Sequence, residues 1–263
     1  MITDRLYMML RGTPWVRRQL KRILLHSAHR ERVISRFGHK LLVDPAELHG
    51  FYLYYEREYD DHIFQFLLPR LRTFRRALDL GANIGIYTVF LAQHVARIDA
   101  FEPEPSVLAC LRHNLRLNLV RNVTVHETCV GRKTGSVRFI KPDRHNKGVG
   151  RIGSGQSEAV DRPCVSLDDF FGDAIDEPCL IKMDIEGAEL LAIQGAQYAL
   201  ANRRAPVCLL IETHPNEIAE AGGSLDALKA SLDSLGLTVY GLTPDGLVAQ
   251  QPGLWCRFWW AEG

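Results

Sequence analysis

The stretch at residues 77–90, ALDLGANIGIYTVF, most constrains what this chain can fold into. A short apolar run that ends in glycine is typical of a buried parallel strand. Gly81 and Gly85 bound a tight turn, and residues 86–94 are predicted to form the helix that follows it. Glycines let the backbone pass close to a ligand, and a helix start offers unpaired amide donors. The pattern therefore predicts a nucleoside-cofactor site at a strand end of an α/β sheet, and an ordinary strand-to-helix loop is the alternative.

The residues around the turn indicate which cofactor it would hold. The turn G-A-N-I-G lacks the middle glycine of the dinucleotide fingerprint. We expect Asp79 to repel the diphosphate of NAD and to suit the cationic end of S-adenosylmethionine. Glu102 follows the next predicted strand, 23 residues after Asp79, the interval at which an acidic residue reaches a ribose hydroxyl pair. The predicted cofactor-binding residues at this turn are Asp79, Gly81, Asn83, Gly85 and Glu102.

The charge of the chain is unevenly distributed. Its 263 residues are 46% hydrophobic with a net charge of +1, which gives no whole-chain argument for a nucleic-acid partner. Residues 1–36 carry nine Lys or Arg and two acidic residues, a charge of +7, which leaves −6 for the rest. We therefore predict a basic helical extension at 1–36 and one catalytic domain at 37–263. Its basic amphipathic helix either packs on the domain or serves as a lid or docking surface for an acidic substrate or an anionic membrane face.

The six cysteines are scattered and show no C-x-x-C spacing. This pattern predicts reduced core residues of a cytoplasmic protein and neither a disulfide framework nor a zinc site. No run approaches the length of a membrane span, so we expect at most peripheral membrane contact through residues 1–36.

Alternating strand and helix patterns predict a doubly wound, mostly parallel sheet of about seven strands. The third strand ends at Thr128-Cys129-Val130, and we predict that Cys129 borders the adenine. Residues 142–158 are predicted to be an irregular loop, either substrate-facing or disordered. The other expected elements are a strand at 37–44, a helical segment at 47–71, an antiparallel strand at 136–140, buried strands at 179–185 and 205–211, and a final pair at 238–242 and 255–260.

Polar side chains follow the fourth and fifth strands of this predicted sheet. Period two places Asp184 and Glu186 on one side of the fourth strand, and Glu212 and His214 end the next. His214 is the first candidate general base because its unperturbed pKa is near neutrality, with Asp184 or Glu186 second. A structural role for His214 is the alternative. Asp184, Glu212 and His214 could instead hold a divalent metal, although we do not expect one.

Five motifs occur in an informative order, and their residues are D-x-G-A-N-x-G-x-Y-T from Asp79, F-E-P at 101–103, S-L-D at 166–168, K-M-D-I-E-G-A-E at 182–189 and I-E-x-H at 211–214. This set resembles the FkbM-type family of S-adenosylmethionine-dependent methyltransferases over roughly residues 55–240. The resemblance implies a class I methyltransferase (Rossmann-like) fold and methyl transfer, typically to a hydroxyl of a sugar or a natural product. A protein or nucleic-acid acceptor, an NAD(P)-dependent oxidoreductase and a catalytically silent fold are the alternatives.

Overall fold

The computed structural model describes residues 7, 14–25, 31–56, 59–141, 150–153, 159–249 and 257–263 of this chain. Its main sheet has eight strands in the order β13-β12-β14-β11-β10-β3-β4-β5. The five strands from β11 to β5 are parallel, whereas β14 runs antiparallel to both β11 and β12, and the edge strand β13 runs antiparallel to β12. The strands are β3 (Arg76–Leu80), β4 (Arg97–Phe101), β5 (Val123–His126), β10 (Cys179–Met183), β11 (Val207–Glu212), β12 (Thr238–Thr243), β13 (Gly246–Ala249) and β14 (Phe258–Glu262).

This strand order is that of the class I methyltransferase fold with one added edge strand, so the predicted fold class is confirmed. The chain passes outward from β3 to β4 and β5, and then returns to the other side of β3 to form β10 and β11. The order therefore reverses between β3 and β10. In open α/β sheets, ligands bind beyond the carboxyl ends of the strands at such a switch point.

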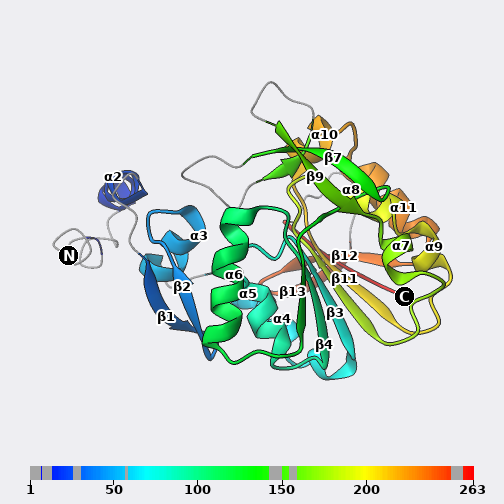
Figure 1. Ribbon diagram of the computed structural model, residues 1–263, viewed down its shortest axis with the longest axis horizontal. Coiled ribbons are helices and arrows are strands. Elements are labelled where there is room, and N and C mark those ends of the chain that lie inside the picture. Colours follow the sequence, from blue (N-terminus) through cyan, green and yellow to red (C-terminus); the bar gives the residue numbers. More distant parts are fainter. Residues whose placement is uncertain are drawn as a thin grey trace.

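Helices cover both faces of the main sheet (Figure 1). One layer holds α4 (Asp61–Leu67), α5 (Ile86–Ala92) and α6 (Pro105–Leu117), and the other holds α8 (Glu189–Gln194), α9 (Gln197–Ala201) and α11 (Leu225–Ser234). Successive residues of a strand face opposite ways, so Leu180 of β10 packs into the first layer and Ile181 into the second. Burial on both faces explains the continuous apolar runs of these strands.

A second, smaller sheet lies over one end of the main sheet (Figure 1). Its strands are β6 (Cys129–Val130), β7 (Gly135–Ile140), β8 (Arg151–Ile152) and β9 (Ala159–Val165), in the order β6-β9-β7-β8. The antiparallel strand expected at 136–140 is confirmed. The expectation of an irregular loop at 142–158 is wrong at β8, and residues 142–149 and 154–158 lie outside the described residues. The sequence does not predict β9, because this strand contains Pro163 and proline is disfavoured inside strands.

The N-terminal segment is more divided than the sequence indicates. Its elements are α2 (Pro14–Leu25), β1 (Arg32–Arg36), β2 (His39–Val43), α3 (Leu48–Phe51) and a π-helix (Tyr52–Glu56). The single strand expected at 37–44 is one arm of a β1–β2 hairpin that turns at Phe37 and Gly38, both with positive φ. The predicted domain boundary at residue 36 falls at this turn. The helical segment expected at 47–71 is divided into separate short helices, and Asp60, with φ +49°, precedes the first residue of α4.

The C-terminal strands are paired as expected but contain one strand more. Strand β12 is antiparallel to β14, and β14 lies between β12 and β11. The sequence analysis missed β13, which pairs with β12 across the turn at Pro244 and Asp245. The Pro-Asp-Gly sequence there is a turn signal that marks this hairpin. The predicted start of the last strand at residue 255 lies outside the described residues.

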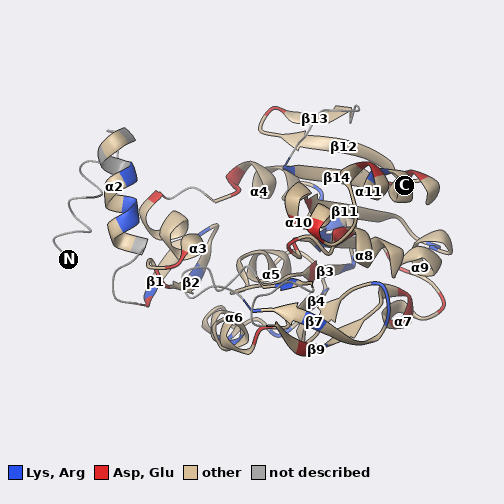
Figure 2. Cartoon of the chain, turned by 90° about the horizontal axis from the view of Figure 1, so that it is seen from above, with Lys and Arg blue, Asp and Glu red and all other residues tan. Residues whose placement is uncertain are grey.

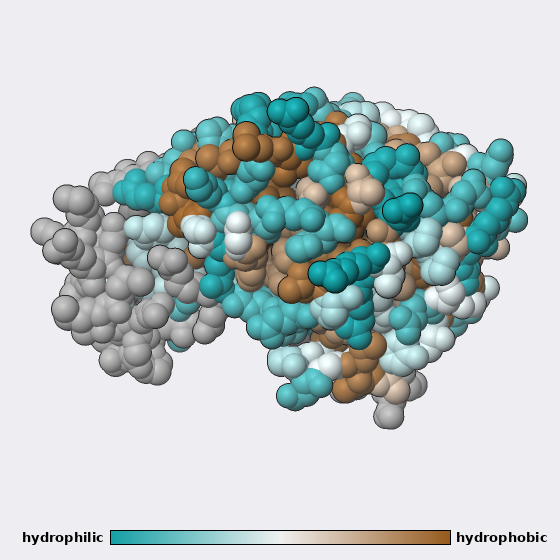
Figure 3. All heavy atoms as spheres, turned by 90° about the horizontal axis from the view of Figure 1, so that it is seen from below, coloured by the Kyte–Doolittle hydropathy of each residue, from teal (hydrophilic) through white to brown (hydrophobic). Residues whose placement is uncertain are grey.

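Charged residues are concentrated at two places in Figure 2. Lys and Arg lie along α2, and acidic and basic residues gather where β11 leads into α10 (Pro215–Glu220). The face seen in Figure 3 carries mostly hydrophilic residues, with apolar residues in smaller groups between them. Within the described part of the chain, no helix has the length and apolar character needed to cross a membrane.

Candidate active site

The turn between β3 and α5 adopts a backbone that favours glycine at both ends. Gly81 has φ +77°, and a Cβ there would lie 1.8 Å from the backbone oxygen of Asp184. Gly85 has φ +90°, and its Cβ would lie 2.6 Å from the Leu111 side chain. Asn83 lies between them at φ +49°. The glycines thus let this turn lie directly against the end of β10 and against α6.

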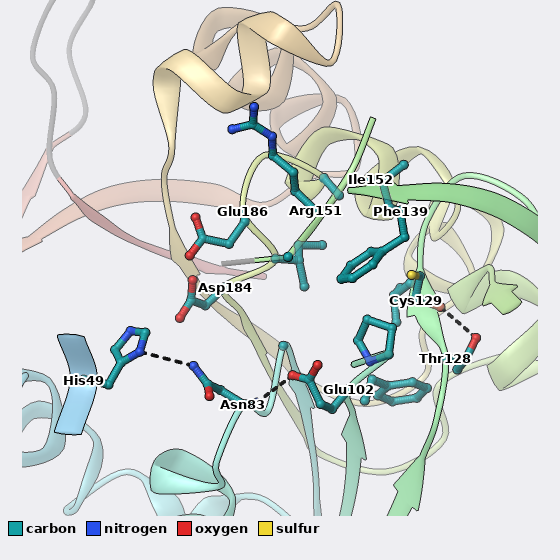
Figure 4. A pocket seen from close by; sticks show the side chains of 17 residues that line it. His49, Asn83, Glu102, Thr128, Cys129, Phe139, Arg151, Ile152, Asp184 and Glu186 are labelled. Atoms are coloured by element: carbon teal, nitrogen blue, oxygen red, sulfur yellow. Dashed lines mark hydrogen bonds between the residues drawn. The ribbon is translucent and has the colours of Figure 1, made fainter. Parts of the chain in front are cut away.

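A cavity opens beside this turn at the carboxyl ends of β3, β4 and β10 (Figure 4). One end is lined by apolar groups, among them Phe139 and Ile152 of the smaller sheet. The opposite end is polar and includes His49, Asp184 and Glu186. This cavity therefore lies at the strand ends where the sequence predicts the cofactor site, beside the switch point between β3 and β10.

Glu102 lies on the cavity wall just after β4. Its two carboxylate oxygens accept hydrogen bonds from the backbone N–H groups of Asn83 and Glu104, each at 2.9 Å. These bonds fix the carboxylate on the turn while each oxygen keeps capacity to accept another bond. Burial raises the pKa of Glu102 to about 7, although the two backbone donors oppose the shift.

The structure brings most of the predicted site residues together. Those that line the cavity are Gly81, Asn83, Glu102, Cys129, Asp184 and Glu186. Cys129 belongs to β6 at the apolar end, where burial raises the pKa of its thiol to about 12 and keeps it neutral. Asp79, Gly85 and His214 are not among the lining residues.

Asp79 lies beneath the turn and does not line the cavity, whereas the sequence predicts that it contacts the cofactor. Its side chain is fully buried beneath the turn and accepts a 2.6 Å hydrogen bond from Thr88 Oγ1. Lys182 Nζ lies 3.0 Å from Asp79 Oδ1 as an ion pair and donates to the Gly81 carbonyl at 3.0 Å. Asp79 therefore supports the turn through Lys182. Because Lys182 neutralises its charge, the expected repulsion of a dinucleotide diphosphate has no basis in this structure.

His214 lies behind the polar end of the cavity, between two carboxylates. Its Nε2 is 3.1 Å from Asp184 Oδ1 and its Nδ1 is 3.5 Å from Glu186 Oε2. Burial lowers the pKa of His214, but the hydrogen bond and charge of Asp184, with Glu186, raise it further, to about 10. His214 is thus an imidazolium at neutral pH, contrary to the near-neutral pKa that made it the first candidate base.

The two carboxylates at the polar end of the cavity have opposite pKa shifts. Burial opposes ionisation of Asp184, but Lys182 and His214 together hold its pKa well below the usual range. Burial and the charge of Asp184 raise the pKa of Glu186 to about 7. Glu186 also has φ +52°, a left-handed backbone that is uncommon outside glycine and is often found at functional sites. Glu186 is therefore the carboxylate suited to exchange a proton near neutral pH.

The possible metal ligands do converge. One ligand atom from each of Asp184, Glu212 and His214 lies within 4.8 Å of the others. However, Arg257 already pairs with Glu212 at 2.7 Å, and Lys182 Nζ lies 3.8 Å from Asp184 Oδ2. A cation would compete with these positive groups, so we treat the set as an ion-pair cluster, and the absence of a metal stays a prediction.

Comparison with protein-family models matches residues 79–237 to the methyltransferase FkbM domain, which is more than half of the chain. The chain belongs to the FkbM methyltransferase family. This confirms the resemblance drawn from the motifs and makes the protein an S-adenosylmethionine-dependent methyltransferase.

Three solved structures with similarity to this FkbM-family methyltransferase are distant from it in sequence. The FkbM methyltransferase from Methylobacillus flagellatus KT is 23% identical over 72% of this chain and 44% of its own, with a TM-score of 0.45. M. jannaschii TYW2 in complex with AdoMet is 13% identical over 90% and 87%, with a TM-score of 0.46. Precorrin-6y C5,15-methyltransferase from Geobacter metallireducens GS-15 is 16% identical over 76% and 86%, with a TM-score of 0.40.

The chain thus spans less than half the length of the Methylobacillus protein. No curated protein sequence matches the chain significantly. The family assignment rests on the domain match and on the motifs.

The cavity of the methyltransferase suits S-adenosylmethionine. The Glu102 carboxylate can accept hydrogen bonds from the two ribose hydroxyls, and the neutral apolar end near Cys129 and Phe139 suits an uncharged purine. The turn at Gly81 allows the close backbone approach that such a ligand requires. These contacts of Gly81, Asn83, Glu102 and Cys129 stay predictions.

Sequence reasoning missed the parts of the site that come from outside the main sheet. His49 of α3 lines the polar end and lies 3.4 Å from the Asn83 side chain, Nδ1 to Nδ2. Burial lowers the pKa of His49, so its ring is neutral at pH 7. In the sequence, Gly50 beside His49 is the one local indication that the backbone packs closely here, because a Cβ on residue 50 would lie 2.0 Å from the Asp44 carbonyl oxygen. Phe139 and Ile152 come from strands whose pairing the sequence did not indicate.

We expect S-adenosylmethionine binding to strengthen as pH rises through about 7. The free protein holds Glu102 protonated below that pH, whereas ribose hydroxyls favour the ionised carboxylate, so binding should release a proton. Calorimetry in two buffers of different ionisation enthalpy measures this release. Glu102→Gln should weaken binding by about 1.5–3 kcal/mol and abolish the pH dependence.

The matched control is Glu189→Gln. Glu189 is also buried with a pKa raised to about 7 by its burial, but it does not line the cavity. Its variant should retain the pH dependence of cofactor binding. Wild-type affinity that stays constant between pH 6 and pH 8 would contradict the assignment of Glu102 to the ribose.

Proposed function

We propose that this methyltransferase methylates a hydroxyl oxygen on a sugar, glycan or small natural product. The observation that supports the proposal is the carboxylate of Glu186, which lines the polar end of the cavity and has a pKa near neutrality. A hydroxyl oxygen is a weak nucleophile until its proton is removed, whereas a neutral amine or a thioether can attack the methyl group without first losing a proton. A poised proton acceptor at this place therefore favours an alcohol acceptor.

The side chains at the polar end have separate roles in this proposal. S-adenosylmethionine supplies an electrophilic methyl group on a sulfonium. Glu186 accepts the proton of the acceptor hydroxyl on its carboxylate. His214, which is positively charged and lies 3.5 Å from Glu186 Oε2, holds that carboxylate in place. Asp184 remains ionised and keeps His214 protonated. Alignment of the two reactants in the cavity can contribute about 7–11 kcal/mol.

Transfer of labelled methyl groups to a cell extract tests the acceptor class directly, because every potential acceptor is present at once. The purified protein is incubated with methyl-tritiated S-adenosylmethionine and an extract of cells that lack the gene, and the products are separated into small-molecule, glycan, protein and nucleic-acid fractions. We expect label in the first two, in a base-stable methyl ether. Label only in protein or nucleic acid would overturn the proposal and support the alternative acceptors.

A further inference from the structure

Helix α2 is attached to the rest of the protein by one face. Leu24 is buried in a small cluster with Phe51 and Tyr55. Lys21 Nζ donates to the Tyr52 hydroxyl at 2.7 Å and lies 4.3 Å from the centre of that ring. These contacts fix which side of α2 faces the protein, because residues 21 and 24 lie close together on a helix surface.

The opposite face of α2 exposes an unusual combination of side chains. Trp15 is 71% exposed and Ile23 is 58% exposed. Arg18 and Arg22 are also exposed, and spacings of three, seven and eight residues from Trp15 place all four on one side. The helix contains no acidic residue, and the positions of its Lys and Arg residues are coloured along it in Figure 2. We call these four residues the outer face of α2.

We propose that the outer face of α2 docks the methyltransferase on an anionic membrane surface, with the helix lying in the plane of the interface. Arginine attracts anionic headgroups, and tryptophan is favoured at the level of the headgroups. Ile23 adds an aliphatic side chain that can enter the acyl boundary but cannot stack on a nucleic-acid base as an aromatic ring does.

The charge distribution of the whole chain supports this partner. Residues 1–36 carry +7 and the remainder −6, so an anionic surface attracts the end of the molecule that holds α2 and repels the rest. Within the described residues no helix can span a bilayer, so the contact is peripheral.

Vesicle sedimentation of the full chain tests the proposal. The probes are vesicles of phosphatidylcholine alone and of an equal mixture of phosphatidylcholine and phosphatidylglycerol. We expect binding to the mixed vesicles only, weakened by added salt. The variant Trp15→Ala/Arg18→Glu should bind roughly thirty-fold more weakly, because it removes the interfacial tryptophan and changes the charge by two units.

The matched control is Leu119→Ala/Arg121→Glu, which removes an equally exposed apolar and basic pair next to α6. It should bind as the wild type does, and circular dichroism should show that both variants are folded. Equal binding to both kinds of vesicle, equal loss in both variants, or binding to total RNA without binding to vesicles would each overturn the proposal.

Discussion

Replacement of Glu186 by glutamine should lower turnover about 10²- to 10⁴-fold while leaving S-adenosylmethionine affinity nearly unchanged. This range is the usual contribution of a general base, and glutamine keeps the shape of the side chain but cannot accept the proton. In the wild type, turnover should rise with pH through about 7 and then level off, because Glu186 must be ionised to act. In Glu186→Gln this rise should disappear. Initial rates at saturating S-adenosylmethionine between pH 5.5 and pH 9, with the extract fraction that takes up the label as acceptor, measure both effects.

The matched variant is His49→Gln, because the neutral imidazole of His49 is a second possible proton acceptor on the polar wall of the cavity. If Glu186 is the base, His49→Gln should keep the rise near pH 7. A rise that persists in Glu186→Gln and vanishes in His49→Gln would transfer the role to His49. His214→Ala should also lower turnover, but mainly by releasing the Glu186 carboxylate from its position.

The parts of the fold that repeat locally could be predicted from the sequence. The glycine turn after β3 and the acidic residue after β4 have fixed positions relative to their strands, and the structure places Gly81 and Glu102 on one cavity. Asp184 and Glu186 also line this cavity, but not through the period-two alternation expected of them, because β10 ends at Met183 and Ile185 lines the same cavity. Strand β13 and strand β9 were missed because their signals, a Pro-Asp-Gly turn and a strand interrupted by Pro163, are weak without their partners.

The protonation states of the site could not be predicted from residue types. The pKa of His214 is set by Asp184 and Glu186, and the burial that raises the pKa of Glu186 is a property of the folded loop. Asp79 illustrates the same point. Its position in the motif suggested a ligand contact, but Lys182, more than a hundred residues later, occupies its carboxylate. Such long-range pairs depend on which strands are neighbours, and here β3 and β10 are adjacent.

The largest loss of stability should follow Lys182→Met. Lys182 is buried, and although burial lowers its pKa, Asp79 and Asp184 raise it further, so the ammonium stays charged throughout the neutral range. Methionine fills the space but leaves the fully buried Asp79 carboxylate without its counter-ion. Loss of one partner of a buried ion pair typically costs about 3–5 kcal/mol. Urea unfolding at pH 7 measures the change in the free energy of unfolding.

Two further variants separate the buried pair from a general effect of losing a lysine. Lys229→Met breaks the exposed 2.6 Å pair with Asp233 on α11 and should cost no more than about 0.5 kcal/mol. Asp79→Asn/Lys182→Met removes both charges, and asparagine can still accept the hydrogen bond from Thr88, so this variant should recover much of the lost stability. Its affinity for S-adenosylmethionine should nevertheless stay below that of the wild type, because no side chain then donates a hydrogen bond to the Gly81 carbonyl. An equal loss in the free energy of unfolding for Lys182→Met and Lys229→Met would show that the buried Asp79–Lys182 pair does not stabilise the turn between β3 and α5.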